Sequence, residues 1–222
     1  MPSASPATPG APRVVAVLGS ARGDGHTARV LDAVLEGARR TDPPAAGSDP
    51  GGALIERVDL GALQIADYDY DQSADDDFLG VARAMADADA VVFATPVYWY
   101  AMSAPLKRLF DRLTDLVTVH KLLGRQLAGR QVWLVASGAD PALPDGFEVP
   151  FRSTATYLDM DYRGALYASV HGGGPRPPEA ERRAAAFGTT VCRAASAHRA
   201  GSATGDDHRQ RDEPKTERGP GG

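Results

Sequence analysis

Short apolar runs alternate along this chain with longer segments of helical periodicity, and few folds accommodate that order. The first run, Arg13–Gly19, is apolar at nearly every position, as is typical of a strand buried on both faces of a sheet. From about His26 to Arg40, apolar residues recur three and four positions apart, which predicts a helix with one buried side. Because the alternation repeats, it predicts a parallel sheet whose strands are connected by helices.

The full pattern predicts five strands and five helices. The strands are expected at Arg13–Gly19, Ala53–Asp59, Ala90–Thr95, Gln131–Ser137 and about Gly164–His171. The helices are expected at His26–Arg40, from about Asp75, at Ala104–Val117, at Phe147–Leu158 and at Pro178–His198. This set favours an α/β fold with three layers, in which a doubly wound, five-stranded parallel sheet has the flavodoxin-like order 2-1-3-4-5. Ligands of such sheets bind outside the carboxyl ends of the strands, so the loops after strands one, three and four are the candidate site.

Composition and charge narrow the class of protein. The hydrophobic share of 43% and the charged share of 24% are ordinary for a globular domain, which we place at residues 13–198. Residues 1–12 and about 199–222 lack apolar periodicity and are predicted to be disordered tails. The net charge of −5 argues against nucleic acid as a partner. A single cysteine, Cys192, and the lack of a signal-peptide pattern or a long apolar run favour a cytoplasmic protein without membrane contact.

The loop after the first strand has the parts of a phosphate cradle. Between Gly19 and Thr27 it offers the hydroxyls of Ser20 and Thr27, flexible backbone at Gly23 and Gly25, and the amino end of the following helix. It lacks the endings of a Walker A loop and of a dinucleotide fingerprint, so a terminal monophosphate fits better than a pyrophosphate. A plain glycine-rich turn is the alternative, and His26 either donates to the phosphate or simply occupies the first helical turn.

Three consecutive aromatic residues, Tyr98, Trp99 and Tyr100, follow the third strand at the predicted carboxyl edge of the sheet. Large aromatic side chains at such an edge favour a flat apolar ligand, and a flavin ring is one. The backbone amides of Val97 to Tyr100 are expected to bond the pyrimidine edge of that ring. The alternative is that the aromatics pack on a neighbouring loop or on a second subunit.

The segments GSARGDGHT (19–27) and ATPVYWYAMSAPLKRLFDR (94–112) together resemble the NAD(P)H-dependent FMN reductase and iron–sulfur flavoprotein group of the flavodoxin superfamily, over about residues 13–140. The resemblance implies FMN as the cofactor. It assigns the FMN phosphate to Ser20, Arg22, Gly25, His26 and Thr27, the flavin ring to Pro96, Val97, Tyr98, Trp99 and Tyr100, and a third flavin-edge loop to Ser137, Gly138, Ala139 and Asp140.

One departure from the group is informative. The iron–sulfur members carry a cysteine cluster where this chain has Ala66–Gln72 and no cysteine, so a flavin-only relative is predicted. The aspartates of this segment have the spacing that opens a calcium loop, but the later positions do not match, and no metal site is expected. We expect the segment to shape a pocket wall, with Tyr68 and Tyr70 near the flavin.

The resemblance further implies that NADPH or NADH delivers hydride to bound FMN, and that electrons pass on to a quinone, an azo compound, a nitro compound or a flavin. The cofactor carries this chemistry, so no catalytic side chain is predicted. A homodimer or tetramer is implied as well. Two alternatives stay open: a flavodoxin-type electron carrier, and a flavin-binding regulatory or interaction module.

Overall fold

The structure is a computed structural model that describes residues 10–40, 52–71, 75–170 and 178–209, with side chains as far as residue 201. Five parallel strands form one sheet in the order β2-β1-β3-β4-β5. They are β1 (Arg13–Leu18), β2 (Leu54–Asp59), β3 (Ala90–Pro96), β4 (Gln131–Gly138) and β5 (Asp161–Ser169). The predicted fold class and strand order are confirmed.

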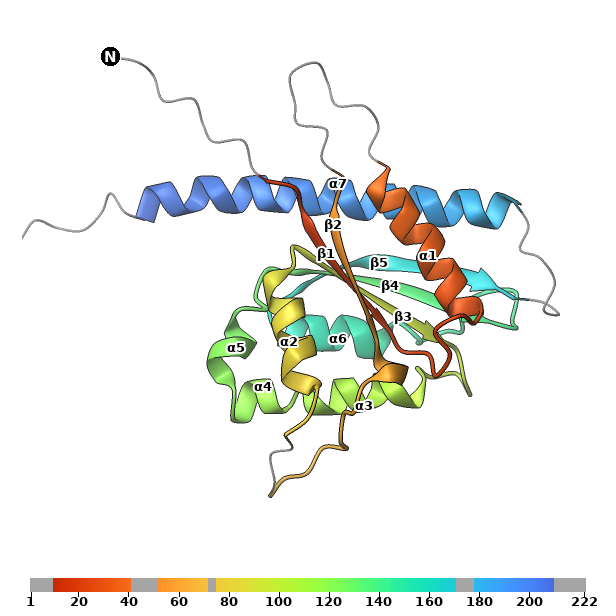
Figure 1. Ribbon diagram of the computed structural model, residues 1–222, viewed down its shortest axis with the longest axis horizontal. Helices are drawn as coiled ribbons and strands as arrows, with labels where there is room; N and C mark the ends of the chain where they lie inside the picture. The colour runs from red at the N-terminus through yellow and green to blue at the C-terminus, as the bar shows by residue number, and fades with distance from the viewer. Residues whose placement is uncertain (1–9, 41–51, 72–74, 171–177, 210–222) are drawn as a thin grey trace, which may run out of the picture.

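Helices cover both faces of the sheet (Figure 1). The helices α1 (His26–Arg39) and α7 (Pro178–Arg209) pack on one face. The other face carries α2 (Phe78–Asp87), α3 (Ala104–Arg112), α4 (Asp115–Thr118), α5 (Lys121–Arg125) and α6 (Val149–Tyr157), and a short 3₁₀ helix, η1 (Leu60–Ala62), follows β2. The central strands β3 and β4 are buried at every position, which explains why their sequences are continuous apolar runs.

The helix predicted at 104–117 is interrupted. It ends at Arg112, and the next amides bond back three residues instead of four, as Thr114 does to Asp111 and Leu116 to Leu113. This tighter turn brings the Asp115 carboxylate to 2.8 Å from the buried Arg112 guanidinium. The apolar pattern continues through the break, so periodicity alone predicts one helix.

The last strand also differs from its prediction, because β5 begins at Asp161 and ends at Ser169. Asp161 and Arg163 near its start are polar and exposed, since β5 is an edge strand. The pairing with β4 shifts between Val132 and Trp133, opposite Gly164, whose φ is 137°. A glycine permits this backbone conformation.

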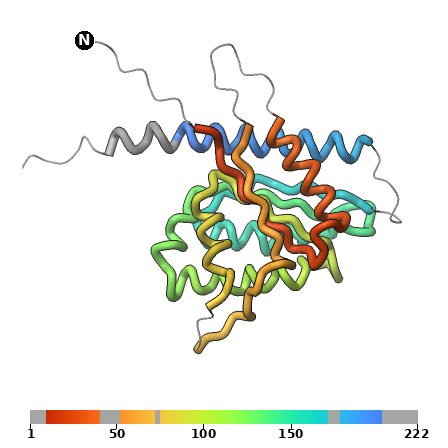
Figure 2. The backbone as a smooth tube through the Cα atoms, viewed as in Figure 1, coloured from red at the N-terminus to blue at the C-terminus, as the bar shows by residue number. Residues whose placement is uncertain are grey.

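The last helix extends beyond the predicted boundary at residue 198 and continues to Arg209, so part of the expected tail is helical. Helix propagation adds one hydrogen bond per residue, which does not require apolar periodicity. The backbone trace shows α7 running past the upper end of α1 (Figure 2). The two helices touch where both have glycine, because a Cβ on Gly188 would overlap the Val34 carbonyl and a Cβ on Gly37 would overlap that of Ala185.

Two parts of the expected tails lie outside the described residues. They are residues 1–9 and residues 210–222. Within the described part, the Pro12 carbonyl already accepts a hydrogen bond from the Leu54 amide at 2.8 Å. None of the described helices has the length and apolarity that crossing a membrane would require.

Candidate functional site

The loops after β1, β3 and β4 are fastened together at the carboxyl edge of the sheet. The Thr27 Oγ1 and Ser137 Oγ atoms are 2.7 Å apart and buried. The Val97 amide donates to the Ser137 carbonyl at 2.7 Å, and the Ser103 hydroxyl donates to the Gly19 carbonyl. These contacts join three segments that are far apart in sequence into one rim, which we call the carboxyl rim.

The first loop leads into an uncapped helix. Gly25 is the N-cap of α1, no side chain caps this helix end, and the first turn has no acidic residue. The amino end of α1 therefore presents unpaired amides and the positive end of the helix dipole. A Cβ on Gly25 would lie 3.8 Å from Arg22 Nε, so the Arg22 side chain lies against the same helix end. This arrangement suits an anion.

The remaining predicted phosphate residues lie in the same loop. Ser20 is buried, and its hydroxyl accepts the Arg22 amide at 3.2 Å. Thr27 is buried in the first turn of α1, whereas His26 is the first helical residue and is half-buried. The structure thus brings together all five residues that the sequence assigns to the phosphate, and their contact with a phosphate stays a prediction.

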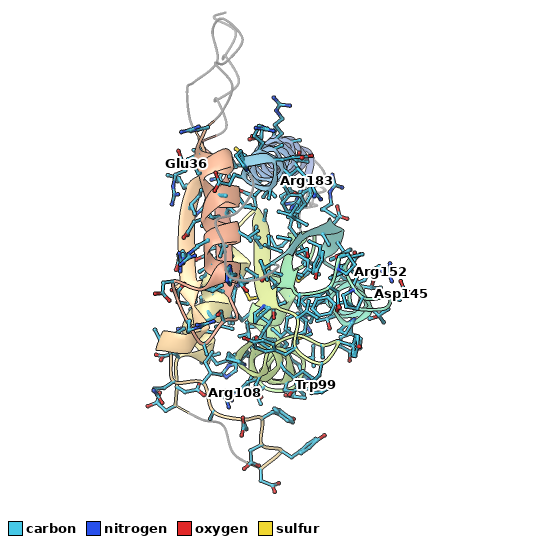
Figure 3. All side chains as sticks on the ribbon, turned by 90° about the vertical axis from the view of Figure 1, so that its right-hand side faces the viewer. Glu36, Trp99, Arg108, Asp145, Arg152 and Arg183 are labelled. Carbon is cyan, nitrogen blue, oxygen red and sulfur yellow. The ribbon has the colours of Figure 1, made fainter. Side chains whose placement is uncertain are left out.

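The aromatic residues after β3 form a tight two-residue turn. The Tyr98 amide donates to the Ala101 carbonyl and the Ala101 amide to the Tyr98 carbonyl, both at 3.0 Å. Trp99 and Tyr100 have φ values of 50° and 62°, which is a strained conformation for residues with large side chains. Tyr98, Trp99 and Tyr100 are 59%, 94% and 72% exposed, so most of their surface is not covered by another loop among the described residues. Figure 3 shows Trp99 at the end of the molecule that also carries Arg108.

The expectation that the amides of Val97 to Tyr100 all serve the flavin is wrong for two of them. The Val97 amide is bonded to Ser137 and the Tyr98 amide to Ala101. The reason is that this loop is tied to β4 and closed on itself by its own backbone.

The third loop begins where β4, β3 and β5 approach closely. A Cβ on Gly138 would lie 2.9 Å from the Tyr167 hydroxyl oxygen and 3.2 Å from Val97 Cβ. The Tyr167 hydroxyl donates to the Asp140 carbonyl at 2.8 Å. Burial, assisted by the Asp140 charge, raises the pKa of Tyr167, so this phenol stays protonated and remains a donor. Ala139 and Asp140 are exposed beyond this junction.

The segment with Tyr68 and Tyr70 is anchored next to the rim. The two rings contact each other edge to face at 4.9 Å, and Asp67 pairs with Arg108 of α3 at 2.6 Å. Tyr70 is exposed. The proximity of these tyrosines to a flavin stays a prediction.

Sequence reasoning missed several residues of the rim. Thr95 accepts the Ser103 amide at 3.0 Å through its hydroxyl, and Ser103 in turn reaches Gly19. Tyr167 and Arg57 also contact the loops, from the two edge strands. Thr95 could have been found, because it is a polar residue at the end of a predicted strand. The contacts of Ser103, Tyr167 and Arg57 depend on which strands are neighbours, so the sequence offered no signal for them.

The groups at the rim fit FMN. The uncapped end of α1, the buried hydroxyls of Ser20 and Thr27 and the Arg22 guanidinium are donors suited to a phosphate monoester. The exposed aromatic turn offers apolar surface to a flat ring. In addition, the buried Ser169 hydroxyl at the end of β5 has no hydrogen-bond partner among the described residues.

This fold, with a phosphate-type loop after β1 and an aromatic loop after β3, defines a flavodoxin-like flavoprotein. The family model of the NADPH-dependent FMN reductases matches residues 12–173, and the chain belongs to this family. The match confirms the predicted resemblance, and the name of the family agrees with the predicted oxidoreductase class and with the predicted pair of FMN and NAD(P)H.

Individual relatives agree with the family. The chain is 26% identical over 106 residues to YwqN of Bacillus subtilis (strain 168), which carries the name of an NAD(P)H-dependent FMN-containing oxidoreductase. That stretch covers 46% of this chain and 56% of YwqN, so the chain matches about half of the relative's length.

Two solved structures share the fold. The Trp repressor binding protein of Bacillus subtilis superposes with a TM-score of 0.56 at 20% identity, over 81% of this chain and 99% of that one. The WrbA-like flavodoxin protein of Agrobacterium tumefaciens gives 0.55 at 21% identity, over 85% and 99% of the two chains.

Proposed function

We propose that this protein is an FMN-dependent NAD(P)H oxidoreductase that passes electrons to a small acceptor such as a quinone, an azo compound, a nitro compound or a flavin. The observation that carries the proposal is the carboxyl rim, in which Ser137 joins the phosphate-type loop to the aromatic loop. Bound FMN supplies the redox chemistry, since its ring accepts hydride from a nicotinamide and gives electrons to an acceptor.

The residues of this chain bind and orient the cofactor. Ser20, Arg22, Gly25, His26 and Thr27 would hold the phosphate, because the dipole of α1 and the hydroxyls favour an anion. Pro96, Val97, Tyr98, Trp99 and Tyr100 would line the flavin ring, and Ser137, Gly138, Ala139 and Asp140 would form a third loop at its edge. The aromatic side chains shield the ring from water, and no side chain acts as an acid or base.

The first test is an absorbance spectrum of the purified protein before and after anaerobic addition of NADPH, then of NADH. Flavin bands that bleach with either nucleotide support the proposal. Flavin bands that persist with both contradict it and favour a flavodoxin-type electron carrier. A protein that takes up no flavin after incubation with FMN also contradicts it and favours an interaction module.

Two further parts of the proposal need other measurements. We propose a homodimer or tetramer, because the exposed aromatic turn is surface that a second subunit could cover. Light scattering coupled to gel filtration measures this directly, and a monomer at micromolar concentration contradicts it. We also propose a cytoplasmic location, which cell fractionation tests.

A further inference from the structure

Arg57 of β2 ties three parts of the fold together beside the first loop. Its Nε and Nη2 atoms donate to the two carboxylate oxygens of Asp59, at 2.7 and 3.0 Å. Its Nη1 donates to Asp32 of α1 at 2.6 Å, and its Nη2 donates to the Gly23 carbonyl at 2.7 Å. The guanidinium therefore spans β2, α1 and the loop between β1 and α1.

The backbone of the loop between β1 and α1 lies close to the Arg57–Asp59 ion pair. A Cβ on Gly23 would lie 3.0 Å from Asp59 Oδ2 and 3.9 Å from Arg57 Nη2. Two residues later, Gly25 is the N-cap of α1, and the first helical amides follow it. The Gly23 carbonyl that Arg57 binds therefore lies two residues before the N-cap of α1.

The donors of Arg57 are directed at protein acceptors. Four hydrogen bonds engage Nε, Nη1 and Nη2, and the side chain is only 26% exposed. The hydrogen bond to Asp59 is the main cause that raises the pKa of Arg57, so the group stays charged. A planar guanidinium can satisfy partners in three directions, whereas a lysine ammonium cannot match this fork.

We infer that Arg57 is a positioning residue for phosphate binding: it holds the Gly23 carbonyl toward β2 and so presents the amino end of α1 to a phosphate monoester. This inference rests on the proposed function, in which the loop holds the FMN phosphate. Arg57 acts through the loop and does not itself touch the cofactor.

The test compares the affinity of the apoprotein for FMN with its affinity for riboflavin, which lacks the phosphate, by flavin fluorescence titration. For Arg57→Ala and Arg57→Lys, we expect the Kd for FMN to rise about tenfold, as for the loss of one hydrogen bond to a charged group, with the Kd for riboflavin unchanged. The matched control is Arg163→Ala, since Arg163 lies on the opposite edge strand and pairs with Asp161 two residues away at 2.9 Å. This control should change neither affinity.

A second variant separates positioning from simple charge. Asp59→Asn replaces one of the two oxygens that accept from Arg57 by an amide NH₂ group, so the bidentate contact is lost, and it makes the neighbourhood one unit more positive. If Arg57 acts by position, Asp59→Asn weakens FMN binding. If only local charge matters, the same variant tightens FMN binding, and that result overturns the inference.

Three other outcomes also overturn it. They are an unchanged FMN affinity in Arg57→Lys and Asp59→Asn, an equal loss of FMN and riboflavin affinity, and a control that loses as much as the Arg57 variants. A wild-type protein that binds neither flavin is a different result, because it refutes the proposed function before any variant is measured. Arg57→Lys and Asp59→Asn retain polar side chains, so they serve if Arg57→Ala does not fold.

Discussion

The hydroxyl oxygens of Thr27 and Ser137 lie 2.7 Å apart in the protein interior, although 110 positions separate the two residues in sequence. One belongs to the first turn of α1 and the other to the end of β4. This contact places the phosphate-type loop and the third loop at a fixed distance from each other. The site therefore depends on tertiary structure as much as on its loop motifs.

Replacing Thr27 by valine tests that dependence. Thr27→Val keeps the side-chain shape but leaves the buried Ser137 hydroxyl without this partner, which we expect to lower the free energy of unfolding by about 1–3 kcal/mol. FMN affinity, measured by fluorescence titration, should fall about tenfold if a hydrogen bond to the phosphate is also lost. Thr156→Val is the control, because the Thr156 hydroxyl donates to the Arg152 carbonyl on the exposed side of α6. An unaltered FMN affinity in Thr27→Val would count against the assigned role.

The backbone strain of the aromatic turn should lower the stability of the protein, whereas its aromatic side chains should favour FMN binding. Trp99 and Tyr100 both have positive φ, which Asn and Gly tolerate in a two-residue turn. The double variant Trp99→Asn/Tyr100→Gly should raise the free energy of unfolding by about 1–2 kcal/mol, since the strain is relieved. Its affinity for FMN should fall, because it lacks two of the exposed rings. Chemical denaturation and flavin titration of the same preparation measure both, and a variant that is less stable with intact affinity would contradict this account.

The buried Arg112 should be among the most sensitive positions for stability. Its guanidinium bonds Asp76 and Asp115, and all three side chains are almost inaccessible to water. Arg112→Leu leaves two buried carboxylates without their cation, so we expect a loss of about 3–5 kcal/mol in denaturant unfolding. Lys107→Ala is the control on the same helix, because the Lys107–Asp111 pair is exposed and should contribute less than about 1 kcal/mol. Similar losses of stability in the two variants would show that the buried Arg112 network contributes no more than the exposed Lys107–Asp111 pair.

Asp76 should make stability depend on acid pH. Burial alone raises the pKa of the Asp76 carboxyl, but hydrogen bonds from the Ala66 amide and from Arg112 outweigh it and hold this pKa below its usual value. A carboxyl with a lowered pKa in the folded state contributes stability above its unfolded pKa of about 4, and this contribution is lost as pH falls through the folded pKa.

We therefore expect the free energy of unfolding to decrease as the pH is lowered below about 4. Asp76→Asn should be less stable than the wild type near neutrality and should lose less on acidification. Urea unfolding at a series of pH values measures this difference. Asp145→Asn, at an exposed loop position, is the control and should follow the wild-type curve. If the free energies of unfolding of Asp76→Asn and of the wild type decrease in parallel as the pH falls, Asp76 is not the source of the acid dependence.

Two glycines of α7 should respond to alanine in opposite directions. At Gly188 an added methyl would overlap the Val34 carbonyl, so Gly188→Ala should destabilise the protein by about 1–3 kcal/mol. At Gly201 nothing lies within 4 Å of the added atom. Gly201→Ala should therefore be neutral or stabilising by up to about 1 kcal/mol, because alanine lowers the entropy of the unfolded chain. Equal effects in thermal unfolding would mean that the helix contact is loose.

The parts of the fold that depend on local pattern were predictable. The strands β1, β3 and β4 are apolar runs whose burial requires no knowledge of their neighbours. The positions of the phosphate-type loop and the aromatic loop follow from motifs that lie directly after these strands. The end of α3 at Arg112 was not predictable, because the apolar spacing continues through it and the partner of Arg112 in the fold, Asp76, is distant in sequence.

The connections within the site were not predictable either. The contacts of Arg57 with Gly23 and of Tyr167 with Asp140 bring together residues from the two edge strands and the loops. Such partners depend on strand order and on the register of strand pairing. A single sequence favours a fold class with a given strand order, but it does not specify the register. The hydrogen bonds of the Val97 and Tyr98 amides were not predictable for the same reason. They depend on how the backbone of the loop is placed against β4 and against itself, and not on residue type.

The contact between α7 and α1 also has a consequence for where this protein can be divided. The family match ends at residue 173, before α7 begins, yet Ala184, Val191 and Cys192 of α7 are buried with Val34 of α1. A fragment trimmed to the recognisable family segment would keep α1 but would lose the apolar cover that α7 gives to α1 and to part of that face of the sheet. The cooperative unit that folds is thus longer than the segment by which the family is recognised, and a shortened form of the protein should retain α7.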